Sequence, residues 1–291
     1  RTKDNLKTAL VQVQESEHAL KESKEELEKA HLDLTKTQEQ IIDSIDYAKL
    51  IQQSILPSRA EMDRYLAEYF TILKPRDIVG GDYYLLKKTT DGFFIAVADC
   101  TGHGVPGALM TMMTSTLLTR VIATNPDDSP ASILAKLHAQ VRETLEAQSD
   151  QKHLENGLDI ALCKVCPEKQ QITFAGGGLP FIIADETGVR EIAGDRLHLG
   201  FSQERKSIVF TDQLVPLTPE SRFYLITDGI LDLPGGPFGH GFGRRRLLAL
   251  LERLARLPMT TQGDQMMQEL TAYQESWTAK DDMTMIGFQI K

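Results

Sequence analysis

Four short segments of the sequence each place an aspartate beside a glycine or beside a second carboxylate. They are Gly80-Gly81-Asp82-Tyr83, Asp99-Cys100-Thr101-Gly102-His103-Gly104, Thr227-Asp228-Gly229 and Asp281-Asp282-Met283-Thr284. Asp99 and Asp228 each follow an apolar run typical of a buried strand, so we expect their side chains at the end of a rigid sheet, where several can meet. Ligands that are all oxygen suit a hard divalent cation, Mg²⁺ or Mn²⁺.

Carboxylates that gather in one place repel one another, so such a group needs either protons or a metal ion. A metal ion is the more useful solution, because it binds a phosphate oxygen and lowers the pKa of a bound water until that water is a nucleophile near neutral pH. Each segment also has an ordinary interpretation, since Asp-Gly is a common turn. One segment alone therefore does not predict a metal site.

The four segments in this order and with these flanks are much more specific. Over about residues 42–291 the sequence resembles the bacterial SpoIIE/RsbU-type branch of metal-dependent protein serine/threonine phosphatases (type 2C). Further segments carry the same resemblance: Leu158-Asp159-Ile160-Ala161-Leu162, Ala175-Gly176-Gly177 and the helical stretch from Ser44 to Pro57. The resemblance implies an α+β fold in which two packed antiparallel β-sheets are flanked by helices.

The resemblance also implies a role for each aspartate. Asp99 would bridge two metal ions, Mg²⁺ or Mn²⁺, and the backbone carbonyl of Cys100 would complete the second metal site. Asp228 and Asp282 would hold the first ion, with Asp82 beside them as a ligand or through a metal-bound water. The nucleophile would be the water shared by both ions, so these four aspartates form the expected catalytic set and no phospho-enzyme is expected.

Three stretches depart from the family pattern. Leu85 stands where many relatives carry Asp, and Gly178 and Leu179 stand near the place where relatives often have His. The stretch Gly235–Gly243 is rich in glycine and is either a flap over the substrate or a loose surface loop. None of these departures removes an expected metal ligand, but they leave the substrate contacts and a third metal site open.

Other residues with chemical potential have simpler interpretations. His103 would be a general acid for the leaving hydroxyl or, as we favour, a residue that orders its turn. Cys163 and Cys166 have the Cys-x-x-Cys spacing of a zinc site, but no second pair and no nearby His accompany them. We therefore interpret both cysteines as strand residues.

The elements that must position these residues follow from the hydrophobic pattern. Strands are expected at 93–98, 157–165, 172–175, 179–184, 222–227 and 283–290, and helices at 106–123, 130–148, 244–256 and 261–277. The strands come in adjacent groups with helices between the groups. This order favours an α+β domain with mainly antiparallel sheet over a doubly wound α/β fold.

The first 56 residues are different, because they contain neither Pro nor Gly and are rich in helix formers. Large apolar residues recur there every seven positions, at Leu6, Val13, Leu20, Leu27, Leu34 and Ile41. The second column of the heptad is mostly small, which predicts a marginal parallel dimeric coiled coil that can shift or open. A single solvated helix is the alternative. We expect a helical linker over 1–56 and a phosphatase domain over 57–291.

The composition argues against several other classes of protein. The 291 residues are 41% hydrophobic with a net charge of −9, and no basic block indicates a nucleic-acid surface. The three cysteines do not make a disulfide framework. No apolar run approaches the ~20 residues of a membrane span, and no signal peptide is recognisable at Arg1. We expect the cytoplasmic part of a longer, membrane-anchored protein whose upstream sensor is outside this sequence.

Two functional hypotheses remain. The first is a metal-dependent phosphatase that acts on phosphoserine or phosphothreonine of a small, antagonist-like regulatory protein in a partner-switching pathway, and that forms a homodimer through its N-terminal helix. The second is a catalytically silent dimeric adaptor that binds the phosphoprotein without hydrolysing it. A nucleotide hydrolase lacks support, because the sequence has no Gly-x-x-x-x-Gly-Lys loop.

Overall fold

The computed structural model describes the backbone of residues 2–146, 156–201 and 208–291, and the side chains of 16–18, 20–145, 156–201 and 208–291. The chain forms two compact units, 1–48 and 49–291. Helix α1 (Thr2–Ser54) makes up the first unit, and its last turns belong to the second. The expected long N-terminal helix is therefore present.

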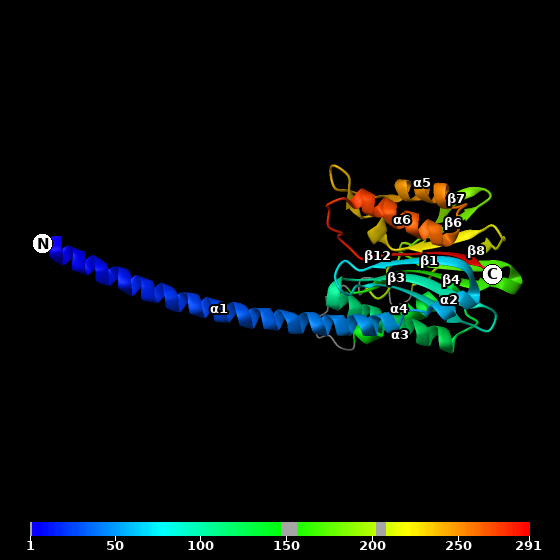
Figure 1. Ribbon diagram of the computed structural model, residues 1–291. Helices are drawn as coiled ribbons and strands as arrows, with labels where there is room; N and C mark the ends of the chain where they lie inside the picture. Colours follow the sequence, from blue (N-terminus) through cyan, green and yellow to red (C-terminus); the bar gives the residue numbers. More distant parts are fainter. Residues whose placement is uncertain (1, 147–155, 202–207) are drawn as a thin grey trace. The chain divides into compact units, whose positions relative to one another are not determined.

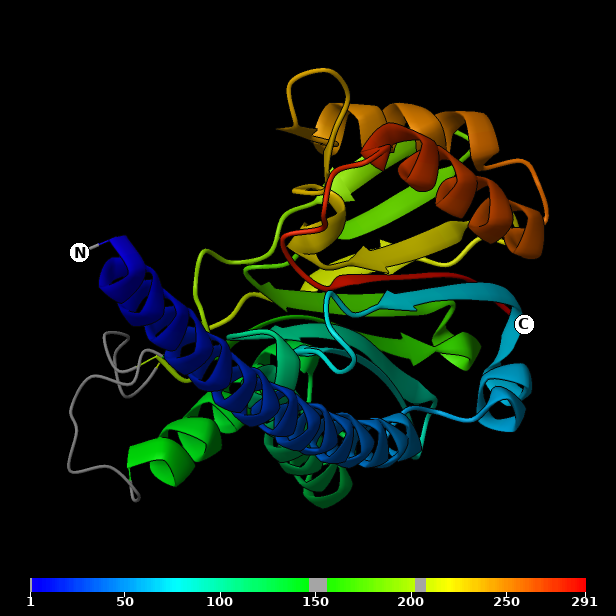
Figure 2. The same ribbon diagram turned by 60° about the vertical axis from the view of Figure 1, so that its left-hand side comes forward.

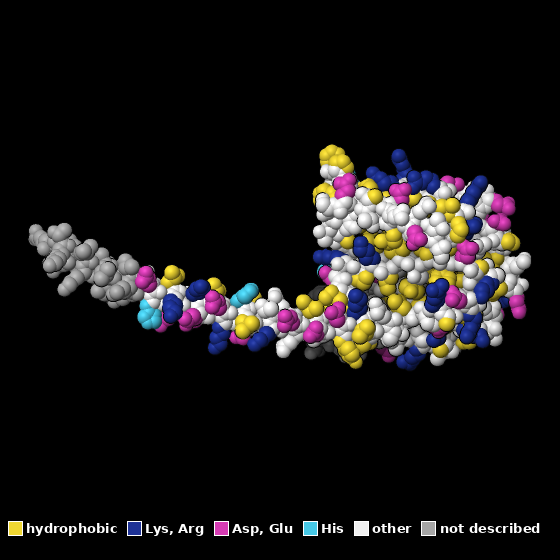
Figure 3. Space-filling model, viewed as in Figure 1, with side chains coloured by type: hydrophobic (Ala, Val, Ile, Leu, Met, Phe, Trp, Pro, Cys, Tyr) yellow, Lys and Arg dark blue, Asp and Glu magenta, His cyan; other side chains and the backbone are white. Residues whose placement is uncertain are grey.

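The heptad residues of α1 with described side chains are exposed in the single chain, as Leu20, Leu27, Leu34 and Ile41 all show. Figure 3 shows hydrophobic side chains lying among charged ones along this helix. The expected heptad positions Leu6 and Val13 lie outside the described side chains. An exposed seam fits both a coiled-coil partner and a lone solvated helix, so the coiled coil stays a prediction.

The second unit contains two five-stranded sheets in which every pairing is antiparallel. One sheet has the order β1 (Leu66–Lys74), β12 (Met283–Ile290), β9 (Arg222–Ile226), β6 (Phe181–Asp185) and β7 (Gly188–Ile192). The other has the order β2 (Asp82–Lys88), β3 (Phe93–Cys100), β4 (Leu158–Cys166), β5 (Gln171–Gly177) and β8 (Gln213–Pro216).

Helices cover the outer faces of the sheets (Figures 1 and 2). Helices α3 (Gly104–Thr124) and α4 (Pro130–Glu146) pack on the sheet that contains β3, and α5 (Arg244–Leu254) and α6 (Met259–Gln274) pack on the sheet that contains β9. The short helix α2 (Arg59–Tyr65) leads into β1. The smaller pieces are η1 (Pro167–Lys169), η2 (Asp228–Ile230) and the hairpin of β10 (Pro234–Gly235) and β11 (His240–Gly241). The expected α+β fold with two packed antiparallel sheets is confirmed.

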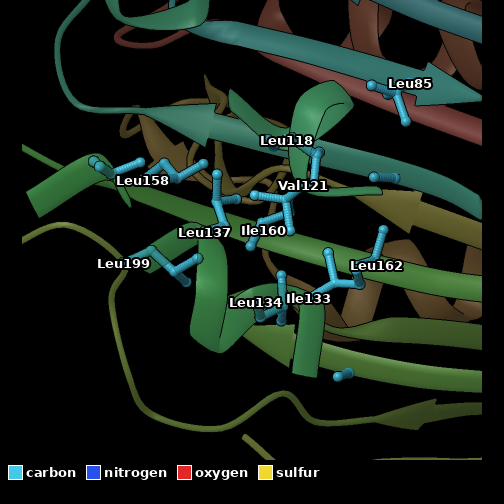
Figure 4. Close-up of a cluster of buried hydrophobic side chains, with 14 of the residues drawn as sticks. Leu85, Leu118, Val121, Ile133, Leu134, Leu137, Leu158, Ile160, Leu162 and Leu199 are labelled. Carbon is cyan, nitrogen blue, oxygen red and sulfur yellow. The ribbon is translucent and has the colours of Figure 1, made fainter. Parts of the chain in front are cut away.

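Strand β3 shows why the central strands are continuous apolar runs. Phe94, Ala96 and Ala98 belong to the core under α3 and α4, which Figure 4 shows in close-up, whereas Ile95 and Val97 belong to the core between the sheets. Both faces of the strand are therefore buried, which removes the polar alternation of a strand with one wet face.

Helix α3 corrects the expectation that no apolar run approaches the length of a membrane span. It is long and apolar enough by composition to cross a membrane, although half of the relevant stretch is buried inside the second unit. Leu118, Val121 and Ile122 pack into the core under this helix. These contacts are those of a core helix in a globular domain.

The expected helices are present with shifted ends. The helix expected at 106–123 begins at Gly104, and the one expected at 261–277 begins at Met259 and ends at Gln274. The helix expected over 130–148 is observed to Glu146, and positions 147 and 148 lie outside the described residues.

Besides the short β10–β11 hairpin, the strands that the hydrophobic pattern did not predict are β1, β2, β7 and β8. All four lie at the edges of the two sheets, whereas the six predicted strands lie inside them. An edge strand is covered less completely than an interior one, so its sequence carries more polar residues and a weaker apolar signal.

Candidate active site

Three aspartates form a row across neighbouring strands at one end of a sheet. Asp82 on β2 pairs with Asp99 on β3, and Asp99 in turn pairs with Asp159 on β4. Residues directly opposite each other in an antiparallel pair point to the same face, with Cβ atoms about 4.5–5.5 Å apart. Val97, two residues before Asp99, lies in the core between the sheets, so the row faces the other sheet.

The end of β9 and the start of β12 meet this row from the second sheet. The Thr227 hydroxyl donates to Oδ2 of Asp82 over 2.7 Å, and it accepts from the backbone N–H of Thr284 over 3.0 Å. Thr227 also donates its own N–H to the Thr284 carbonyl, at 3.0 Å. These bonds hold Asp228, the next residue, beside the row.

Asp82 lacks a partner for one of its oxygens. Its side chain is buried, with 4% exposed. Oδ1 has no hydrogen-bond partner among the residues that the structure describes. A buried oxygen of this kind carries a full desolvation cost unless it binds a proton or a cation.

The pKa values of the neighbouring carboxyl groups are raised as well. Burial raises the pKa of Asp82, of Asp99 and of Asp228, and neighbouring carboxylates raise each of them further. The direct interaction between the Asp99 and Asp228 side chains raises the pKa of Asp99 and lowers that of Asp228. The donor set of carboxylate oxygens and the unpartnered oxygen of Asp82 fit a hard divalent cation.

The paired aspartates before β12 have different surroundings. Asp282 is buried, and its Oδ1 and Oδ2 accept the backbone N–H groups of Arg76 and Gly81, both over 2.6 Å. Burial raises the pKa of Asp282, while these two bonds act in the opposite direction. Asp282 therefore holds the segment that leads to Asp82, and both of its oxygens are already used.

Asp281 instead faces a pocket of about 320 Å³ together with Asp99 and Cys100. The negative charge of Asp281 contributes to the raised pKa values of Asp82, Asp99 and Asp228. The structure thus brings Asp82, Asp99 and Asp228 together as expected, and it adds Asp281, for which the resemblance implies no role. Asp282 lies behind them as a support. The sequence marks the Asp281-Asp282 pair as a candidate, and the structure shows which of the two faces the pocket.

The carboxylates are close together but are not yet arranged as ligands. Within the part of the chain whose side chains are described, no three Asp, Glu, His or Cys side chains form a set that could hold a metal ion as they stand. Both oxygens of Asp282 are bonded to backbone N–H groups, those of Arg76 and Gly81.

A glutamine from the last turn of α1 reaches the same segment. Gln52 is buried, and its side-chain amide donates to the Gly80 carbonyl over 2.6 Å and accepts the Gly80 N–H at 3.4 Å. The hydroxyl of Thr111 on α3 donates to the next carbonyl, that of Gly81, over 2.6 Å. The approach to Asp82 is thus held from both α1 and α3.

The remaining candidates have ordinary surroundings. Cys163 and Cys166 are free, buried residues of β4, which confirms the strand interpretation. Leu85 lies in the core under α3 and α4. The stretch Gly235–Gly243 contains the β10–β11 hairpin, and the Trp277 indole N–H bonds the Gly236 carbonyl over 3.0 Å. This stretch is therefore anchored, and its role toward substrate stays open.

Two packed antiparallel sheets between helices, with carboxylates gathered where the sheet ends meet, define a phosphatase fold of the PP2C type. The chain belongs to the SpoIIE family (Stage II sporulation protein E), which matches residues 89–291. It is 38% identical to the SiaA-PP2C domain of Pseudomonas aeruginosa, with a TM-score of 0.79 over 88% of this chain and 99% of that domain.

Two further relatives show how far the likeness extends. Phosphoserine phosphatase RsbU of Bacillus subtilis (strain 168) is 26% identical over 148 residues, which is 51% of this chain and 41% of that protein. The chain thus spans less than half of that curated relative. The catalytic domain of the serine/threonine protein phosphatase PstP, solved with two manganese ions, shares the fold at 14% identity, with a TM-score of 0.54 over 78% of this chain and 98% of that domain.

The different surroundings of Asp281 and Asp282 can be tested by alanine variants. We expect Asp281→Ala to lower metal-free stability less than Asp282→Ala does, because Asp281 adds to the repulsion among the carboxylates, and to weaken Mn²⁺ binding. Asp282→Ala should destabilise the metal-free protein by about 1–3 kcal/mol, because it removes the acceptor of two backbone N–H groups. Thermal unfolding with chelator and calorimetric titration with Mn²⁺ measure the two effects. A wild-type Tm for Asp282→Ala, combined with lost Mn²⁺ binding, would contradict this division.

The repulsion among the carboxylates predicts a pH dependence without metal. A carboxyl group whose pKa is raised by folding costs stability as pH rises above its unfolded value of about 3.9. Metal-free protein should therefore lose stability between pH 5 and pH 8, within roughly the range where buried carboxyls ionise. Asp99→Asn should lose less, because it removes one of these buried charges.

Mn²⁺ should stabilise the wild type much more than the Asp99→Asn variant. At about one hundred times its Kd it should stabilise the wild type by about 2.7 kcal/mol, whereas Asp99→Asn should gain little. Chemical denaturation at both pH values, with chelator and with Mn²⁺, gives the comparison. An equal Mn²⁺ gain in the variant is the result that would exclude Asp99 as a ligand.

Proposed function

We propose that this chain is a Mg²⁺- or Mn²⁺-dependent phosphatase that hydrolyses phosphoserine or phosphothreonine on a small regulatory protein. The observation that carries the proposal is the convergence of Asp82, Asp99, Asp228 and Asp281 from separate sheet ends on one place. Membership of the SpoIIE family and the likeness to RsbU support the choice of a phosphoserine substrate.

The chain's own residues would divide the work as follows. Asp99, which pairs with Asp82 and interacts with Asp228, would contact both ions, with the Cys100 carbonyl as a further ligand. Asp281 would hold an ion from the open side of the pocket, and Asp282 would position the segment before Asp82. Two bound ions supply a water of lowered pKa and neutralise charge on the phosphoryl group. No side chain is required as a nucleophile.

The proposal extends to the regulation of the enzyme. A phosphatase in a partner-switching pathway would remove the phosphate that a cognate kinase adds to an antagonist-like protein. It would work as a homodimer through α1, in the cytoplasm, as part of a longer membrane-anchored protein with an upstream sensor. The exposed apolar seam of α1 supports the dimer, because apolar side chains at heptad spacing gain most when they are buried against a second helix.

The last turn of α1 offers a direct route from the helix to the active site. The Gln52 side chain is hydrogen-bonded to both the carbonyl and the N–H of Gly80. The next peptide N–H, that of Gly81, donates to Asp282. A shift of this turn would therefore displace the segment that carries Asp82. We propose that dimeric packing of the helix near residues 45–56 sets the position of the metal-binding turns.

The alternative of a catalytically silent adaptor can be tested directly. We expect Mn²⁺-dependent release of phosphate from a phosphoserine peptide by the wild type, no release with chelator, and a loss of about 100-fold or more in Asp228→Ala. Asp232→Ala is the matched control, because Asp232 lies nearby and is exposed. Full activity of Asp228→Ala would contradict its assigned role, and an inactive wild type would favour the adaptor.

Truncation tests the regulatory role of the helix. Removal of residues 1–43 should lower turnover and change the oligomeric state, because it removes most of the heptads while keeping Gln52. Turnover and light scattering are measured on the same sample. Gln52→Ala should lower turnover about 10- to 100-fold without changing the oligomer, and the exposed neighbour Gln53→Ala serves as its control. Unchanged turnover and unchanged oligomeric state after truncation would defeat the proposal.

A further inference from the structure

Two histidines face the pocket that contains Asp99 and Asp281, and each is paired with an aspartate. Nδ1 of His103 lies 2.9 Å from Asp77, and Nδ1 of His198 lies 2.5 Å from Oδ1 of Asp159. Both imidazoles are about half exposed. The second pair was not singled out in the sequence, because His198 and Asp159 are far apart in the chain.

The segment that carries His198 is held firmly against the sheet. Its next residue, Leu199, exchanges two backbone hydrogen bonds with Leu158 at the start of β4, over 2.9 and 3.0 Å. Further back, the backbone of Asp195 bonds the N–H of Gly178 and the carbonyl of Gly176. His198 is therefore placed by backbone pairing to β4 and β5 rather than by a free loop.

Asp159 is also fixed in place. It is the third carboxylate in the row with Asp82 and Asp99, and it is mostly buried, with 26% of its side chain exposed. Gly178 lies so close that a Cβ there would be 2.4 Å from the carboxylate. Burial raises the pKa of Asp159, and the hydrogen bond and charge of His198 counteract this.

This pairing decides which imidazole nitrogen is available. A carboxylate that accepts from Nδ1–H fixes the tautomer and leaves Nε2 as the free nitrogen. Phe201 packs edge-on against the ring, with centroids 5.8 Å apart, and limits its rotation. The titratable side chains that line the pocket beside His198 are Asp159 on β4, Asp99 on β3, His103 before α3 and Asp281 before β12.

The reaction needs a proton at the site of the leaving group. When water attacks the phosphorus of a serine phosphate, the P–O ester bond breaks and its electron pair moves to the serine oxygen. That alkoxide is a poor leaving group unless it takes up a proton as the bond breaks. Carboxylates that bind cations are deprotonated and cannot supply it.

We propose that His198 is a catalytic residue, the general acid that donates its Nε2 proton to the leaving serine or threonine oxygen, with Asp159 as its positioning residue. The products are the free hydroxyl, inorganic phosphate and neutral His198, which regains a proton from solvent. The inference rests on the proposed phosphatase function and names a residue outside the metal ligands.

His198 is better placed for this role than His103. Asp159 is a strand residue in the row of Asp99 and is less exposed than Asp77, at 26% against 48% of the side chain. His103 is the residue that precedes α3, so its bond to Asp77 holds the turn between β3 and that helix. This agrees with the interpretation of His103 as a residue that orders its turn.

The test compares two substrates that differ in their need for a proton. With saturating Mn²⁺ and the full chain, His198→Gln should lower kcat on a phosphoserine peptide by about 10²- to 10³-fold. Its kcat on p-nitrophenyl phosphate should stay close to that of the wild type, because p-nitrophenolate leaves as an anion. The fall of kcat at alkaline pH on the peptide should disappear in the variant.

Matched variants complete the design. Asp159→Asn, which keeps the size of the side chain, should also lose kcat on the peptide but not on p-nitrophenyl phosphate, by a smaller factor. This variant replaces His198→Gln in the test if His198→Gln does not fold. His103→Gln should not show it. Equal losses on both substrates, no loss on either, or a peptide-selective loss in His103→Gln instead would each overturn the proposal. If the wild type hydrolyses neither substrate with Mn²⁺, the phosphatase function itself fails, which is a distinct result.

Discussion

The repulsion among the carboxylates gathered at the junction of the two sheets is the constraint on which the site depends. Asp82, Asp99, Asp228 and Asp282 are held together by backbone pairing and by bonds from Thr227, Arg76 and Gly81. Among the residues that the structure describes, no lysine or arginine forms an ion pair with these four. Folding energy from the cores brings the charges together, and a divalent cation is the group that balances them.

The architecture explains how such an arrangement can be stable. Each sheet is buried on both faces, by the other sheet and by two helices, so the strands that end in aspartates are rigid. The cost of the charged cluster is confined to one end of the sandwich. The segment from Arg76 to Asp82 is bonded to three other parts of the chain: α1, α3 and Asp282. A displacement of this segment would move Asp82, which is the basis of the proposed control through α1.

The pattern of hydrophobic residues predicted the interior strands of the two sheets but not their edge strands. Strands that lie inside a sheet, such as β3 and β4, are apolar throughout and were predicted. The edge strands β1, β2, β7 and β8 were not, because an edge strand has a neighbour on one side only and its sequence can remain polar. Their existence depends on a partner strand that is distant in the chain, as with β1 and β12.

The same distinction applies to the site. Sequence by itself determined which carboxylates are candidates, because glycine-flanked aspartates at strand ends form a specific set, and it determined the family that the chain resembles. Only the tertiary structure decided that Asp281 faces the pocket while Asp282 bonds the backbone, since neighbouring residues in one motif differ only in direction. Only the tertiary structure placed His198 beside Asp159, because backbone pairing between a loop and β4 closes the distance between them.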